Sequence, residues 1–163
     1  MKKLITFLAC CIFAVVCYAQ SVSYYHQILM PEGCKVTLSV AKQDTAYYII
    51  ASVKSDNLQF LKQPIMLLKN YDSEVIKLSG ELLSNKTETS GVMVGNVFVP
   101  ASEIISSAQF QISVEQFEII KDGVAKIRMT TSPIVHEKTF KKDCFGKKLY
   151  QFYQKVKKIE DDF

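Results

Sequence analysis

The chain has 163 residues, of which 48% are hydrophobic and 22% charged, and its formal net charge is +4. These values are typical of an ordinary globular protein and exclude a collagen-like, low-complexity or strongly acidic disordered chain. A chain of this length can bury a core without a metal or disulfide to hold it together.

Residues 1–19 have the pattern of a secretory signal. Lys2 and Lys3 form a basic start, an apolar run extends from Leu4 to Val16, and Cys17-Tyr18-Ala19 is a small-x-small cleavage site. The run is too short for a membrane span. A lipoprotein signal, with one of the leader cysteines modified, is the less favoured alternative. We therefore expect a Gram-negative protein exported to the periplasm, cell surface or medium, with residues 20–163 as one domain of net charge +2.

The first part of this domain has the pattern of a hairpin. Residues 21–33 are aromatic and irregular and end in a Pro-Glu-Gly turn. Residues 35–41 alternate apolar and polar side chains, which predicts a half-buried strand. After a turn at Gln43-Asp44-Thr45, residues 46–54 are rich in aromatic and β-branched residues and should return antiparallel.

The middle of the chain predicts more strands. Residues 65–69 form a short strand, and residues 75–84 another, with Gly80 on its apolar face beside a bulge or a close neighbour. Residues 85–90 have the composition of an exposed loop. Residues 92–99 are apolar on both faces, which predicts a central strand, and residues 104–112 predict the next one.

The last third contains both predicted helices. Ser113 and Gln116 form a capping box that begins a short helix near 113–122. Strands follow over 124–130 and 134–140. A longer amphipathic helix near 143–158 begins at Asp143, whose carboxylate can cap it. Its apolar stripe comprises Phe145, Leu149, Phe152, Val156 and Ile159.

Short links between strands predict an antiparallel, β-rich α+β fold. A β-sandwich or small barrel with an appended helix is the alternative. The terminal helix should cover the sheet, because burying each large apolar side chain is worth about 1.5–3 kcal/mol, whereas each lysine gains only about 1 kcal/mol at an anionic membrane surface. We therefore expect deletion of residues 145–163 to unfold the protein.

Three motifs in the C-terminal third carry a resemblance. They are Phe-x-Ile-Ser-x-Glu-Gln at 110–116, Gly-Val-x-Lys-Ile-Arg at 123–128 and Phe-Lys-Lys-Asp at 140–143, before a helix rich in lysine and tyrosine. This block resembles uncharacterised secreted proteins of Gram-negative gut anaerobes. The resemblance implies no catalytic residues.

Motifs for catalysis, metals and cofactors are not found in the sequence. The two histidines, His26 and His136, lie in no triad or ligand pattern, and His136 is expected to pack or to face solvent. We therefore expect neither an enzyme nor a cofactor. Once the signal is removed, Cys34 and Cys144 remain, and in an oxidising compartment they are candidates for a disulfide; two free thiols are the alternative.

Two surface features predict interactions. Asp44-Thr45-Ala46 resembles the O-glycosylation signal of some Gram-negative anaerobes, which makes Thr45 a candidate acceptor, although Asp-Thr is also common in turns. Residues 138–158 hold eight lysines and one acid. Their candidate contacts with an anionic surface are Lys141, Lys142, Lys147, Lys148, Lys155, Lys157 and Lys158.

Taken together, the sequence predicts a non-catalytic binding or interaction module of the envelope, with a protein or glycan as partner. Nucleic acid is not expected, because the segment has few arginines and the compartment is wrong. Membrane contact should be peripheral at most. The alternative is a small envelope hydrolase or inhibitor with a site built from loops.

Overall fold

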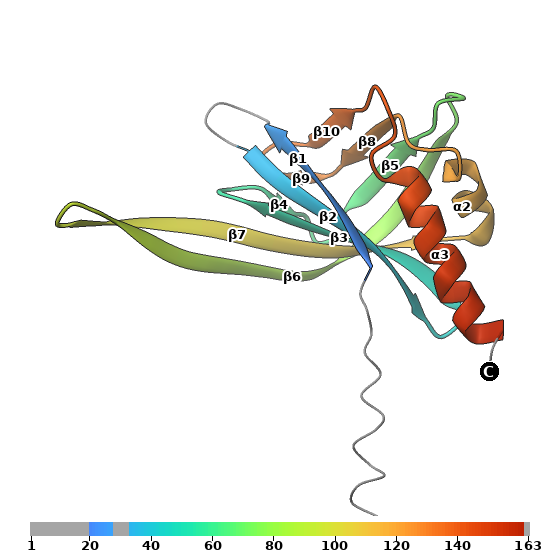
Figure 1. The fold of residues 1–163 in the computed structure, drawn as a ribbon, viewed down its shortest axis with the longest axis horizontal. Coiled ribbons are helices and arrows are strands. Elements are labelled where there is room, and N and C mark those ends of the chain that lie inside the picture. Colours follow the sequence, from blue (N-terminus) through green and yellow to red (C-terminus); the bar gives the residue numbers. More distant parts are fainter. Residues whose placement is uncertain (1–19, 28–32, 162–163) are drawn as a thin grey trace, which may run out of the picture.

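A computed structural model describes residues 20–27 and 33–161; the expected signal, residues 1–19, lies outside the described residues. The elements are β1 (Ser21–Gln27), β2 (Gly33–Gln43), β3 (Ala46–Ser55), β4 (Gln59–Phe60), β5 (Ile65–Lys69), β6 (Val75–Val94), β7 (Val97–Ile112), α2 (Val114–Ile120), β8 (Lys126–Met129), β9 (Thr131–Ser132), β10 (His136–Thr139) and α3 (Gly146–Asp161). Figure 1 shows the strands curled around a core, with α2 and α3 on one side and a long hairpin of β6 and β7 projecting from the other.

The described strands form one eight-stranded sheet in the order β1-β2-β3-β7-β6-β5-β8-β10, and β4 pairs separately with β9. Each neighbouring pair is antiparallel. The sheet is nearly closed into a barrel, so the predicted antiparallel, β-rich α+β class is confirmed.

Alternating side chains build the hairpin of β2 and β3 as predicted. The pairing runs from Cys34↔Ser55 to Gln43↔Ala46, and Asp44 occupies the turn with a φ of 53°. Aspartate tolerates this left-handed conformation better than most residues. The inward-facing side chains in the middle of both strands are fully buried in the core, and those nearest the turn are partly buried.

Gly80 lies against a close neighbour, as expected from its place on the apolar face of β6. A Cβ at this position would come 2.5 Å from the Phe110 ring and 2.7 Å from the Gln109 carbonyl oxygen. Glycine therefore lets β7 pack directly on β6. The predicted bulge lies slightly further on, because Leu82 pairs with Ala108 and Ser84 with Ser107, so that Leu83 is the extra residue.

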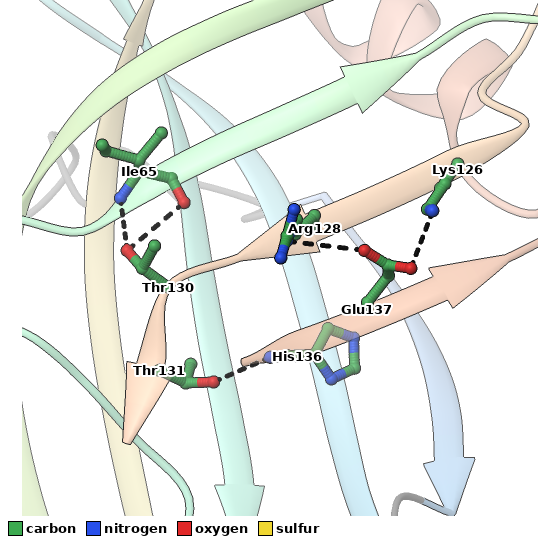
Figure 2. A network of polar contacts seen from close by, with 7 residues as sticks. All are labelled: Ile65, Lys126, Arg128, Thr130, Thr131, His136 and Glu137. Carbon is green, nitrogen blue, oxygen red and sulfur yellow. Dashed lines mark hydrogen bonds and ion pairs between the residues drawn. The ribbon is translucent and has the colours of Figure 1, made fainter. Parts of the chain in front are cut away.

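The two end strands of the sheet, β1 and β10, meet through side chains. The Tyr24 hydroxyl lies 2.8 Å from His136 Nε2, and Lys138 Nζ donates to the Tyr25 carbonyl oxygen. Figure 2 shows how β10 is fixed to its neighbours: its backbone at His136 donates to Thr131 Oγ1 (2.9 Å). These contacts join the ends of the sheet around the core.

On the outer face of the sheet, the Glu137 side chain joins β10 to its neighbour β8. Its carboxylate lies 2.7 Å from Lys126 Nζ and 3.4 Å from Arg128 Nε (Figure 2). The hydrogen bond from Lys126 is the main cause of the lowered pKa of Glu137. Pairs this exposed contribute little to stability, so they mainly fix the alignment of the two strands.

Both predicted helices are present. Ser113 and Gln116 form the capping box of α2. The α3 helix begins at Gly146 rather than near Asp143, but the Asp143 carboxylate accepts the backbone N–H groups of Gly146 (2.8 Å) and Lys147 (3.1 Å), as a cap does. The same carboxylate also accepts the backbone N–H of Val124 (2.8 Å) and so ties the helix start to the segment after α2.

The apolar stripe of α3 packs on the core. Phe145, before the helix begins, and Leu149 within it are fully buried, whereas Phe152 and Val156 are only half-buried. Tyr153, absent from the predicted stripe, is 1% exposed and stacks on Phe117 with ring centroids 4.4 Å apart. The helix therefore belongs to the core, as the balance of apolar burial against lysine attraction predicts.

Three predictions for the strands were wrong. The segment predicted to be irregular begins with β1, which pairs with β2 from Ser21↔Ser39 to Gln27↔Gly33. Residues 85–90, predicted as a loop, continue β6 without a break. Residues 92–99, predicted as a central strand, instead form the end of the projecting hairpin, with a turn at Gly95 and Asn96.

Candidate functional site

The projecting hairpin, called the arm below (residues 85–103), extends beyond the rest of the sheet. The pairing of β3 with β7 ends at Ser55↔Ile104, and that of β5 with β6 ends at Ile65↔Ser79. Between Glu88↔Glu103 and Val94↔Val97 the two strands of the arm pair only with each other. At about 3.4 Å per residue, this part is roughly 20 Å long. A two-stranded hairpin without a third strand or helix is marginally stable in water.

The end of the arm exposes large apolar side chains. Met93 is 61% exposed, Val97 64%, Phe98 60% and Val99 47%. These four residues are called the apolar tip below. Soluble proteins seldom expose a contiguous apolar patch unless it contacts a partner, so the apolar tip is the first candidate for an interaction surface.

Local chemistry explains how the arm turns. Val94 pairs with Val97 across a two-residue turn in which Gly95 has a φ of 62° and Asn96 does not have a positive φ. A positive φ at the first central position alone is typical of a type II′ turn, in which glycine is favoured there. The Phe98 ring lies where a Cβ on Gly91 would be, so this aromatic covers the glycine on the opposite strand.

The arm is also nearly free of charge. From Thr89 to Ser102 the sequence has no Asp, Glu, Lys or Arg. At the base, Glu103 forms an ion pair with Lys54 at 2.8 Å, and this hydrogen bond is the main cause of the raised pKa of Lys54. Charges commonly protect exposed strands from association, and the outer part of this arm does not have them.

A second cluster of polar groups lies inside the protein, where β1, β2 and β10 meet. His136 is 0% exposed; its Nε2 contacts the Tyr24 hydroxyl at 2.8 Å and its Nδ1 contacts Cys34 Sγ at 3.5 Å. The pKa of His136 is lowered to about 4, chiefly by burial and also by the nearby His26 and Lys138. The ring is therefore neutral, and one nitrogen accepts while the other donates.

This cluster has a cysteine and a histidine but not the electrostatics of a nucleophile. Burial raises the pKa of Cys34 to about 11, so the thiol stays protonated. Burial also raises the pKa of Tyr24 above its usual value. His136 packs in the core, one of the two roles expected for it, and the cluster joins the ends of the sheet.

The structure does not contain the predicted disulfide. Both Cys34 and Cys144 are free; Cys34 is buried beside His136, whereas Cys144 is exposed in the segment before α3. Strand alternation directs Cys34 into the core, so the two thiols face different surroundings despite the close packing of β2 and α3.

Thr45 is exposed in the turn between β2 and β3, where the sequence predicts it. It borders a shallow cleft of about 550 Å³ that is also lined by Tyr47, Gln111, Val114 and Glu115. A group attached to Thr45 would therefore lie beside the start of α2.

The seven candidate lysines lie together on α3 and the segment before it, and all are exposed: Lys141, Lys142, Lys147, Lys148, Lys155, Lys157 and Lys158. No ion pair joins any of them to an acid of the described chain. Because the arm projects on the other side (Figure 1), the lysine surface and the apolar tip face different surroundings.

The apolar tip is the candidate site that sequence reasoning missed. Its signal was present: Gly95-Asn96 separates two short apolar runs, which is the pattern of a hairpin with a two-residue loop. The prediction of one central strand follows instead from the apolar residues on both faces of these runs.

The fold and the arm together define a class of architecture: a nearly closed antiparallel barrel, covered by helices, with a projecting hairpin. No known protein family, curated protein or solved structure matches the chain. In the described part of the chain, no group of three metal-ligating side chains is found. Neither helix there is long and apolar enough to cross a membrane.

Proposed function

We propose that the protein is an exported, non-catalytic interaction module of the cell envelope, and that the arm is its binding element. The observation that supports this role is the exposure of the apolar tip on a hairpin that contributes little to the core. Apolar side chains release water when a complementary protein surface covers them. A protein surface suits the apolar tip better than a glycan, because sugars require hydrogen-bonding side chains that the tip does not offer.

A shortened arm tests this proposal. Deleting residues 88–93 together with 98–103 joins Thr87 to Val94 and Val97 to Ile104. Six residues leave each strand, so inward and outward positions still alternate correctly and the original turn is kept. We expect the shortened protein to remain folded and to lose the partner that the intact protein captures after crosslinking in native envelopes.

The matched control reverses charge on the other side of the molecule, at Lys155 and Lys158. This variant should capture the same partner as the intact protein. If the shortened protein captures the partner as efficiently as the intact one, the arm is not the binding element and the proposal fails.

The lysine surface supports a second, accessory role: contact with an anionic envelope glycan. The supporting observation is that its seven side chains are exposed and form no ion pair with an acid of the described residues. Binding of a purified anionic glycan should weaken steeply with salt and decrease in the variant reversed at Lys155 and Lys158. Glycan binding that is equal in this variant and the intact protein would exclude the role.

We also propose export and modification as expected from the sequence. Cleavage after Ala19 would leave Gln20 as the first residue of the exported protein, and an O-glycan would be attached at Thr45. The exposed position of Thr45 in a turn supports its access to a transferase. The intact mass of protein from its native host checks both, since a mass equal to the bare polypeptide of residues 20–163 would refute modification.

A further inference from the structure

The backbone of β6 shows which edge of the arm is open. Gly80 and Leu82 donate their N–H groups to the carbonyl oxygens of Pro64 (2.8 Å) and Lys62 (3.2 Å). The backbone groups of these two residues therefore point away from β7. In an antiparallel pair, inward and outward groups alternate along each strand.

Past the extra residue at Leu83, the register fixes the alternation along the arm. Leu82, whose backbone points away from β7, pairs with Ala108, an even-numbered residue of β7. The β6 residues that pair with even-numbered residues of β7 therefore all have backbone groups that point away from β7. They are Asn85, Thr87, Thr89, Gly91 and Met93. On the side of β6 that faces away from β7, the described chain provides no backbone hydrogen-bond partner for these five residues. The outer edge of β6 is therefore open over the whole arm.

The outer edge of β7 is blocked. The same alternation makes Pro100, which faces Gly91, an outward position. Proline has no N–H to donate, and it is found on edge strands for this reason. From Ile104 onward this edge is occupied by Ser55 of β3. A further strand can therefore join the arm through β6 and not through β7.

We propose that a second copy of this chain covers the arm, with β6 pairing antiparallel to β6 of the other copy about a two-fold axis. This inference rests on the proposed function, since it names the protein surface that the arm binds. Two open edges of equal length satisfy each other's backbone groups, and two-fold symmetry closes the assembly without leaving an edge to extend it.

The charges of Lys86 and Glu88 favour one register for the pairing of the two β6 strands. An axis at Glu88 would place this carboxylate opposite its own symmetry mate, and an axis at Thr89 would leave Lys86 opposite an apolar residue. An axis at Thr87 places Lys86 opposite the second copy's Glu88, twice by symmetry. Opposite charges across paired strands are favourable and like charges are not, so the axis lies at Thr87.

This register also brings Met93 and Phe98, which share one face of the apolar tip, to the body of the other copy. Gly91 of one copy then lies opposite Leu83 of the other, which is 48% exposed, and Met93 lies opposite Glu81. At that place a cleft of about 590 Å³ is lined by residues 62–65 and 79–81. The edge of β6 there is already bonded to Pro64, so the tip leaves the sheet and lies over this cleft.

Charge reversal tests the pairing. Sedimentation velocity of the purified protein should show a dimer that dissociates on dilution. Lys86→Glu and Glu88→Lys should each raise the dimer dissociation constant at least about tenfold, and the double variant should return it close to the original value. Lys35→Glu, an exposed lysine on β2, is the control and should leave it unchanged. A protein that is monomeric at every concentration, or a double variant as weak as the single ones, overturns the proposal.

A disulfide trap checks the axis independently. In a Cys144→Ser background, Thr87→Cys should crosslink two copies on mild oxidation, since facing residues lie about 5.5 Å apart. Thr89→Cys should not, because it would lie about 14 Å from its symmetry mate along the strand. Crosslinking at Thr89 and not at Thr87 would overturn this register.

The two proposals fail separately. If the protein is monomeric but only the intact arm captures a partner from the envelope, the second copy is excluded and the interaction role stands. If the dimer forms and the shortened arm still captures the same envelope partner, the pairing stands and the arm is not the element that binds that partner.

Discussion

His136 should make the folded protein sensitive to acid. Its pKa is about 4 in the folded protein and 6.5 in an unfolded chain, chiefly because burial disfavours the charged ring. As pH falls from 6.5 to 4, the unfolded chain binds a proton that the folded protein does not. The stability from this group is therefore complete above pH 6.5, is lost across that window, and does not change further below it. At about 1.4 kcal/mol for each tenfold difference in proton affinity, the loss is about 3 kcal/mol.

Urea unfolding measured across this window, in the original protein and in His136→Gln, checks the prediction. Comparing the two separates His136 from acidic groups such as Glu137, whose lowered pKa also makes folding weaker in acid. The original protein should lose about 3 kcal/mol more than the variant. His26→Gln is the matched control and should retain most of the acid loss, because His26 is only partly buried. Parallel pH profiles for the original protein and His136→Gln would refute the reasoning.

Three further predictions concern α3 and its start. Leu149→Ala should cost about 2–5 kcal/mol of unfolding free energy by opening a cavity, whereas Lys155→Ala on the exposed face should change it by less than about 0.5 kcal/mol; equal urea midpoints would contradict the burial. Asp143→Ala removes the acceptor of three backbone N–H groups and should cost about 1–2 kcal/mol, and Asp143→Asn, which keeps one oxygen, should cost less. Deleting residues 145–163 should leave a chain that proteases degrade rapidly, and a truncated protein with native circular dichroism would count against the docking of α3.

The sequence predicts those elements whose signals are local. Ser113 and Gln116 are three residues apart, and Asp143 is close to the backbone groups that it caps, so capping could be inferred without knowledge of the fold. The order of the strands in the sheet could not be inferred in this way. Tyr24 and His136 are 112 positions apart, and they meet only because the sheet curls until β1 approaches β10. The same curvature decided that Cys34 contacts a histidine instead of Cys144.

The error at residues 92–99 has a different cause. Apolar side chains on both faces indicate removal from water, but the pattern does not say which molecule provides the cover. The prediction of a central strand requires that the same chain provides it. The structure places these residues at the end of the arm, beyond the pairing of β3 with β7 and of β5 with β6.

The arm therefore lies apart from the residues that form the core of this protein. The barrel, the Tyr24–His136 contact and α3 account for the core, and all lie on residues that the apolar tip does not touch. The arm continues from the core mainly through the pairing of β6 with β7, which fixes its direction and which of its backbone groups face outward. The two edges of the arm differ in their ability to pair with a further strand. Pro100 closes the edge of β7, whereas Gly91, which bears no side chain, lies on the open edge of β6. A partner that pairs with the backbone distinguishes the edge of β6 from that of β7, whereas a partner that only covers apolar surface does not.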